Sequence, residues 1–182
     1  MSGDYLAYTF LYDHTADLRC DFELLTDELA SMTGLLRSLL DERDSAALPE
    51  AREDLSRVIE LIYHLNPSLR TRLTITPEEL AWLREKTLYF QEAVRDALPR
   101  NPAGGPVFLL PQGSTPGALA HVLRCTCKTL VRLLSRHRQQ GNEVDELVFD
   151  FANLLSGYFY SLALWLNKNR RETERLFVSR VY

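Results

Sequence analysis

The chain has 182 residues, of which 46% are hydrophobic and 25% are charged. This composition is typical of a globular domain with a substantial core and not of a disordered chain. The formal net charge of −4 argues against general nucleic-acid binding, which usually needs a basic surface. No apolar run approaches the ~18 residues of a membrane span, and residues 1–12 lack the basic start and apolar centre of a signal peptide. We therefore expect a cytoplasmic protein without nucleic-acid or membrane partners.

The N-terminal segment Tyr5–Tyr12 is aromatic and β-prone, but it is too short and isolated to make a sheet. We interpret residues 1–21 as an extended arm that packs on the remainder of the protein or on a neighbour. From Phe22 onward, apolar residues recur at spacings of three and four, which predicts a first helix that ends in the charged run Asp41–Asp44.

The next two helices have recognisable starts. A second helix is expected from about Pro49, because proline suits the first helical turn, and the Asn66-Pro67 step should end it. The third start is the clearest in the chain. Thr76 supplies a capping hydroxyl, Pro77 occupies the first helical position, and Glu79 stands at the third.

A long loop, residues 99–115, separates the third and fourth helices and contains the apolar, strand-like Phe108-Leu-Leu-Pro111 between turn signals. Such a loop is more often functional than a plain connector. The fourth helix should then open at Thr115-Pro116 and run to about Gln139.

A fifth helix is expected from about Glu143 to Asn167, and it is apolar nearly all round, which is typical of a central helix. Its aromatic run Tyr158-Phe-Tyr160 is interpreted most simply as core. Together these elements predict an all-α fold, a five-helix bundle that forms a single domain over residues 1–182.

The sequence contains few recognisable motifs for nucleotide binding, metal binding or disulfide formation. The sequence has no Walker phosphate loop and no Rossmann glycine fingerprint. Glu60 and His64 have the wrong spacing for the Glu-x-x-His pairs of di-iron bundles, and each histidine is interpreted as a surface or helix-packing residue. The three cysteines cannot all pair within one chain, and Cys125 and Cys127 point about 200° apart around a helix. We expect no metal site and reduced, partly buried thiols.

Four segments, taken in chain order, carry further patterns. They are Thr26-Asp27-Glu28-Leu29, the loop Phe108-Leu-Leu-Pro111 followed by Gly113-Ser114, the His-x-x-Arg of His121-Val-Leu-Arg124, and Asn153-Leu-Leu-Ser156 with Phe159. In this order they resemble the ATP:corrinoid adenosyltransferases of the propanediol-utilisation type, over residues 22–167. The resemblance implies a five-helix bundle of the cobalamin adenosyltransferase-like type, assembled as a homotrimer with active sites between neighbouring subunits.

In that family ATP, with magnesium, binds beside a cobalamin, and cob(I)alamin attacks the 5′ carbon of ATP to form adenosylcobalamin and triphosphate. By this resemblance Asp27 would pair across the subunit boundary with Arg124. Phe108 would close the space under the corrin, so that cobalt keeps no lower ligand and can be reduced. These are the candidate catalytic residues. The candidate cofactor-binding residues are Lys128, Arg132, Asn153 and Ser114.

The departures from the family pattern concern ATP. The family's Thr-Gly-Asp-x-Gly-Thr phosphate segment is reduced to Thr15-Ala16-Asp17, and its Arg-Arg-x-Glu-Arg after the His-x-x-Arg motif is replaced by Lys128-Thr-Leu-Val-Arg132. On the last helix, the family's Arg and Asp are Leu154 and Gly157. Two lost charge-assisted hydrogen bonds would cost roughly 3–6 kcal/mol, which is about 10²- to 10⁴-fold in affinity.

Three functions therefore stay open. The chain is a divergent adenosyltransferase, a non-catalytic relative that binds a corrinoid or a protein partner with ATP handling lost, or a helical scaffold unrelated to corrinoids. The candidate residues also have plainer interpretations. Asp27 and Arg124 would form a surface ion pair or no pair, and Phe108 would be a core residue. Lys128 and Arg132 would belong to a solvated basic face, and Asn153 would make a structural hydrogen bond.

Overall fold

The computed structural model describes residues 9–41, 49–99 and 107–178. Within them it contains five α-helices, which are α1 (Leu18–Asp41), α2 (Pro49–Leu65), α3 (Pro77–Val94), α4 (Thr115–Gln139) and α5 (Glu146–Asn169). Three short 3-10 helices accompany them, η1 (Thr9–Tyr12), η2 (Asn66–Leu69) and η3 (Arg95–Ala97). The prediction of an all-α, five-helix bundle is confirmed.

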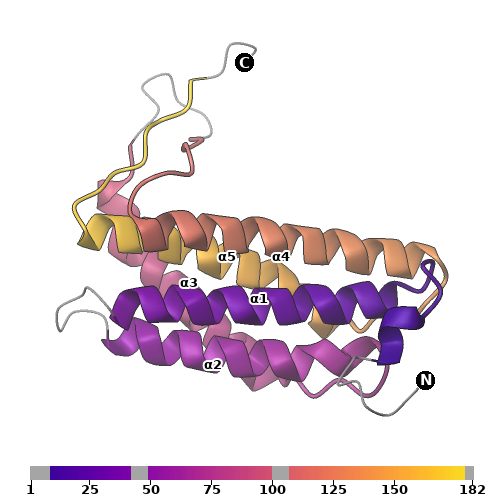
Figure 1. The fold of residues 1–182 in the computed structure, drawn as a ribbon. Coiled ribbons are helices and arrows are strands. Elements are labelled where there is room, and N and C mark those ends of the chain that lie inside the picture. The colour runs from indigo at the N-terminus through magenta and orange to yellow at the C-terminus, as the bar shows by residue number, and fades with distance from the viewer. Residues whose placement is uncertain (1–8, 42–48, 100–106, 179–182) are drawn as a thin grey trace.

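The five long helices lie side by side (Figure 1). Helix α1 contacts α2 and α4, whereas α5 contacts α4 and α3. Helix α5 is more apolar than the sequence analysis allowed, because by length and composition alone it could cross a membrane. However, 61% of its apolar window is buried inside the bundle. It is therefore placed as the core helix of the bundle.

Local capping signals fix where several helices begin. The Thr76 hydroxyl accepts a hydrogen bond from the Glu79 backbone N–H, and the Glu79 carboxylate accepts one from the Thr76 N–H, as predicted. Helix α5 begins at Glu146 rather than near Glu143, because the Asp145 carboxylate accepts from the Leu147 N–H at 2.8 Å and caps the helix there.

The N-terminal region differs from the expected extended arm over residues 1–21. In the part that the structure describes, Thr9–Tyr12 form η1 and the first long helix already begins at Leu18. A buried ion-pair cluster ties this region to the bundle. The Arg70 guanidinium donates to the carboxylates of Asp13 and Glu23, both at 2.6 Å. Arg70 lies far along the chain, so no local pattern could indicate this arrangement.

The core is filled by side chains from all five helices, and its largest fully buried members are aromatic: Tyr158, Phe22, Phe90, Phe151 and Phe159. Tyr158 and Phe159 thus belong to the core, as the sequence suggested. Tyr160, the next residue, is only half-buried and lies on the face of α5 that borders a surface cavity. The middle of α5 is therefore a rigid support for that cavity.

Candidate functional site

An open cavity of about 550 Å³ lies where α3, α4 and α5 meet the segment that precedes α4. Its lining comes from four parts of the chain: Thr87 and Gln91 of α3, Val107, Phe108 and Leu109 of the loop, Arg124 and Lys128 of α4, and Asn153, Leu154, Ser156, Gly157 and Tyr160 of α5. The lining combines apolar side chains with two cations, Arg124 and Lys128. We treat it as the candidate functional site.

The cavity brings together four of the residues that the sequence singled out. Phe108, Arg124, Lys128 and Asn153 all line it, although they come from the loop, α4 and α5. Arg124 and Lys128 are one helical turn apart, so both point from the same face of α4. Convergence of an exposed aromatic ring and two cations on one concave surface is the arrangement expected of a ligand site.

Phe108 is not a core residue. Its side chain is 52% exposed, and Val107 and Leu110 beside it are exposed as well. The backbone of this segment is held by the C-terminal tail. Leu109 forms an antiparallel bridge with Leu176, and the Phe177 N–H donates to the Phe108 carbonyl at 2.7 Å.

Arg124 has unused donor capacity. Its guanidinium lies over the ring of Tyr160, with 5.7 Å between the guanidinium carbon and the ring centroid, and one of its terminal nitrogens is 3.7 Å from the Cys125 thiol. Its buried Nε has no hydrogen-bond partner within the described part of the chain. Burial raises the pKa of Tyr160 while the positive charge of Arg124 opposes this. The phenol is therefore neutral near pH 7, and the guanidinium is the charged group of this wall.

Lys128 and Asn153 are both exposed at the cavity, and no hydrogen bond or ion pair to another described residue occupies either side chain. The structural hydrogen bond considered for Asn153 is therefore not present among these residues. Arg132 is exposed one turn beyond Lys128 and does not line the cavity. Leu154 and Gly157 do line it, so the two family charges that they replace are missing from this surface.

Asp27 lies elsewhere, exposed on α1, where its carboxylate accepts a hydrogen bond from the Tyr63 hydroxyl at 2.8 Å. This hydrogen bond, with the negative charge of Asp27, raises the pKa of Tyr63. Asp27 and Arg124 form no ion pair within the described chain. The expected pairing across a subunit boundary stays a prediction.

Ser114 caps α4 and contacts Asn167 instead of the cavity. The Ser114 backbone N–H and hydroxyl both donate to Asn167 Oδ1, at 2.8 and 2.7 Å, and the hydroxyl accepts from the Gly117 N–H. Asn167 Nδ2 donates to the Gln112 carbonyl at 2.9 Å and to Glu174 Oε1 at 2.6 Å. Ser114 therefore anchors the loop in this structure.

Sequence reasoning missed two residues of this region. Tyr160 was interpreted as core because it belongs to an aromatic run on the most apolar helix. In the structure its ring instead faces the guanidinium of Arg124. Asn167 was taken only as the end of the fifth helix. Its one available signal was an amide at the end of an almost wholly apolar helix, where burial demands hydrogen-bond partners.

Two other cavities contain fewer groups that are free to bind a ligand. The first is a polar cavity of about 530 Å³ near the junction of the N-terminal region with the end of α4, and it includes Ala16, Asp17 and Arg19. Hydrogen bonds from Arg19 hold the pKa of Asp17 far below its usual range, and the carboxylate is thereby committed to Arg19. The described residues contain no group of three or more His, Cys, Asp and Glu that could hold a metal ion.

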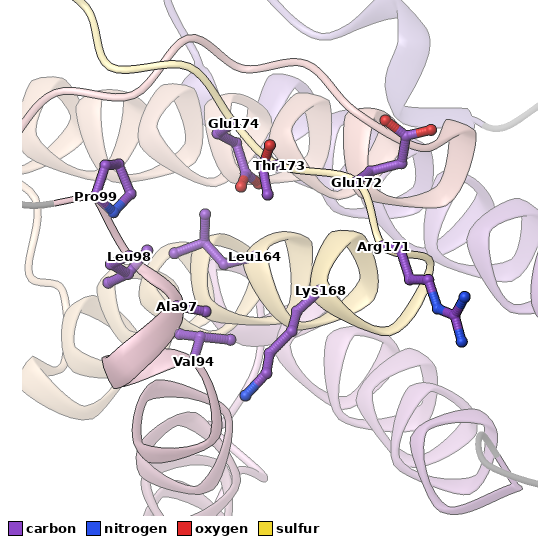
Figure 2. Close-up of a pocket in the computed structure, with 10 residues that line it drawn as sticks. All are labelled: Val94, Ala97, Leu98, Pro99, Leu164, Lys168, Arg171, Glu172, Thr173 and Glu174. Carbon is purple, nitrogen blue, oxygen red and sulfur yellow. The ribbon is translucent and has the colours of Figure 1, made fainter.

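The third cavity is small, about 130 Å³, and lies between the ends of α3 and α5 and the C-terminal tail (Figure 2). Leu98 and Leu164 point toward one another across it, whereas Arg171 is directed away from it. Lys168 donates to the Ala93 carbonyl and so links α5 to α3 here. This cavity is a packing gap beneath the tail.

Comparisons with known proteins agree with these features. The family model for cobalamin adenosyltransferase matches residues 15–166. This match spans most of the chain, and the chain belongs to the cobalamin adenosyltransferase family. A comparison with curated protein sequences found no match.

Solved structures show the same fold. One is a variant of a PduO-type ATP:co(I)rrinoid adenosyltransferase from Lactobacillus reuteri complexed with ATP, with a TM-score of 0.73, 22% identity, and coverage of 89% of this chain and 88% of that chain. Another variant from that organism, complexed with cobalamin and ATP, has a TM-score of 0.72, 20% identity, and coverage of 90% and 87%.

The contact between Asn167 and the start of α4 leads to a stability prediction. A Cβ added at Gly117 would lie 2.1 Å from Asn167 Oδ1, and the Asn167 side chain cannot move away without losing its hydrogen bonds. Gly117→Ala should therefore lower the free energy of unfolding by about 1–3 kcal/mol, as overpacking does. Urea titration followed by circular dichroism would measure this.

Gly34→Ala is the matched control, because a Cβ there meets only Ile59 Cδ1 at 3.9 Å inside α1. This variant should be neutral or more stable by up to about 1 kcal/mol, since alanine favours the helix. Equal stabilities of the two variants would contradict the packing argument.

Proposed function

We propose that this chain binds a corrinoid against Phe108 and transfers the adenosyl group of ATP to its reduced cobalt. The observation that supports this most directly is the shared cavity lined by Phe108, Arg124, Lys128 and Asn153. Those residues were chosen from separate sequence segments for roles in one reaction. Membership of the cobalamin adenosyltransferase family supplies the reaction class, and the two Lactobacillus reuteri structures include complexes with cobalamin and ATP.

The apolar wall suits the corrin side of the site. Covering the lower face of cobalt is a task of exclusion, done by a side chain that offers water and ligands no place to bind. Phe108 has the shape and exposure for this task, because the residue is 52% exposed and lines the cavity. A cobalt ion without a lower ligand is reduced more easily, so this contact would favour formation of cob(I)alamin.

The cationic wall suits the phosphates. In the transfer, cobalt(I) supplies an electron pair for a new cobalt–carbon bond to C5′ of ATP, the C5′–O5′ bond breaks, and triphosphate leaves with that bond's electrons. Lys128 would stabilise the negative charge that develops on the leaving oxygen, and Arg124 would contribute less when its guanidinium is paired with a carboxylate of a neighbouring subunit. Magnesium, which keeps several waters and prefers phosphate oxygens, would enter bound to the phosphates.

The trimer is the second part of the proposal. Arg124 lines the cavity and forms no ion pair within the described chain, and Asp27 is an exposed carboxylate on another face. A carboxylate from a neighbouring subunit would satisfy that guanidinium. In a closed ring each subunit would offer both surfaces, Asp27 on one side and Arg124 on the other.

The corrinoid part is tested by titrating cob(II)alamin anaerobically and recording its visible and paramagnetic spectra, which distinguish four- from five-coordinate cobalt. Wild-type protein with ATP should produce the four-coordinate form. Phe108→Ala should let a fifth ligand return and change affinity little. Leu110→Ala is the matched control, because Leu110 is also exposed in this loop but does not line the cavity.

Two results would count against this assignment. An unchanged cobalamin spectrum at high protein excess would remove the corrinoid proposal, in both a catalytic and a non-catalytic form. A shifted spectrum that Phe108→Ala leaves intact would keep corrinoid binding and remove Phe108 from this role. Binding without adenosyl transfer from ATP would favour the non-catalytic alternative.

Asp27→Ala should loosen the trimer, because removing one partner of a buried ion pair costs roughly 3–5 kcal/mol. Sedimentation velocity over a concentration series would show trimers for the wild type and dissociation of the variant at higher concentrations. Glu28→Ala, which removes the adjacent exposed carboxylate on α1, is the control. A monomeric wild type at micromolar concentration would contradict the proposal.

ATP should bind weakly, with a dissociation constant of about 0.1 mM or higher, because the family's phosphate segment is reduced to Thr15-Ala16-Asp17 and two of its arginines are replaced, by Thr129 and Leu154. Lys128→Ala should weaken binding further, whereas Arg136→Ala, which removes an exposed cation of α4 outside the cavity, should not. Calorimetry and ligand-observed nuclear magnetic resonance can measure both. Micromolar affinity would mean that other donors replace the missing ones.

A further inference from the structure

The loop that carries Phe108 has little packing of its own. Val107, Phe108 and Leu110 are all exposed, so side-chain burial does not fix their position. Its backbone runs beside the C-terminal tail. In Figure 1 the loop is the salmon segment and the tail the yellow segment above the left end of the bundle. The Leu109–Leu176 bridge joins them, and the Leu110 N–H donates to the Arg175 carbonyl at 2.9 Å.

The tail in turn has few apolar anchors. Phe177 and Val178 are 47% and 76% exposed. Leu176 is half-buried, and the Glu174 side chain is only 7% exposed. Its carboxylate accepts a hydrogen bond from Asn167 Nδ2 at 2.6 Å and lies 3.7 Å from His121 Nε2. A buried carboxylate is costly without such partners, and its position is therefore tightly restricted.

Asn167 is fully buried at the end of α5 and connects both segments to the bundle. Its Nδ2 donates to the Gln112 carbonyl in the loop and to Glu174 in the tail, and the Glu172 N–H donates to the Asn167 carbonyl. Phe108 is therefore held through a series of contacts. Asn167 holds Glu174, Glu174 places the tail, and the tail is paired with the backbone of the loop.

We propose that Asn167 and Glu174 are positioning residues for the corrin-facing loop, and that the segment 172–177 is a working part of the site. This inference rests on the proposed function, since it assumes that Phe108 contacts a corrinoid. Neither side chain touches the cavity that Phe108 lines. They act by fixing the position of the Phe108 ring at the cavity.

The first test uses the protein alone and needs no ligand. Hydrogen–deuterium exchange is measured at the amides of Leu110 and Phe177, which make the hydrogen bonds between loop and tail. Glu174→Ala should speed exchange at both by about ten-fold or more, the factor that corresponds to a lost hydrogen bond to a charged group. Glu174→Gln keeps an oxygen acceptor for Asn167 and should restore protection.

Glu172→Ala is the matched control. It removes an exposed carboxylate from the same tail, whereas the contact of this residue with Asn167 is made by its backbone N–H and is preserved. Exchange in the middle of α5, for example at Leu155, should not change in any of these variants. Unfolding of the whole bundle would raise exchange there as well and is thereby recognised.

The second test is the spectrum of bound cob(II)alamin. Glu174→Ala should lose the four-coordinate form in the direction of Phe108→Ala, while its affinity for cob(II)alamin and its melting temperature stay close to the wild type. Glu174→Gln and Glu172→Ala should retain that form. A merely structural role would lower stability and leave the coordination of the bound cobalt unchanged.

The outcomes separate this inference from the proposed function. If exchange at Leu110 and Phe177 is the same in Glu174→Ala and wild type, the positioning role is wrong whatever the protein binds. If exchange rises but wild-type protein never produces four-coordinate cobalt, the proposed corrinoid function fails, and with it the assignment of the positioned ring. If wild type produces that form and Glu174→Ala retains it fully, the tail is not part of the site.

Discussion

The buried side-chain amide of Asn167 holds the rim of the cavity, which is the loop that carries Phe108 together with the C-terminal tail paired with it. An amide offers two acceptor positions and two donors, and here all four are used. The oxygen accepts from the backbone and hydroxyl of Ser114, and the nitrogen donates to Gln112 and Glu174. A carboxylate would lack the donors and an apolar side chain would lack both. No other side chain of this length meets the four demands, and Gly113 and Gly117 leave room for it.

The middle and the end of helix α5 therefore have different structural roles. Its middle is fixed by core contacts of Tyr158 and Phe159, and it presents Asn153 and Tyr160 to the cavity from a rigid support. Its end holds the loop and the tail through polar contacts alone. The neutral hydrogen bonds among these contacts contribute about 1 kcal/mol each and the one to the Glu174 carboxylate about 1.5–3 kcal/mol, so the loop and tail are held by a small number of specific contacts. Such a division suits a site that must admit a large ligand beside a fixed set of charges.

How far the sequence predicted this arrangement depends on the distance along the chain over which each contact forms. The Thr76 capping box and the end of α4 at Gln139 are local, and both were predicted closely. The link from Asn167 to Ser114 spans 53 residues, and the bridge from Leu109 to Leu176 joins the strand-like loop to a tail segment that follows the last helix. No periodicity or capping signal indicates pairings of that kind.

The candidate site was predicted in part for a different reason. Phe108, Arg124, Lys128 and Asn153 were placed together through resemblance to a family, and the structure brings them to one cavity. The same resemblance could not place Ser114, because its hydroxyl is used by Asn167 here. Arg132 is on the right helix but one turn away from the cavity lining. Family resemblance gives the helix and the motif, whereas packing decides which side chains remain free.

The charge balance at Arg124 connects assembly with ligand binding. Arg124 lines the cavity with its guanidinium over the ring of Tyr160, and no described residue forms an ion pair with it. A carboxylate from a second subunit would balance its charge, and so would an anionic ligand in the cavity. Because one guanidinium serves both, pairing it with Asp27 leaves Lys128 as the main free cation for phosphates. The ion pair that would hold the trimer together therefore also reduces the positive charge that this surface offers to ATP.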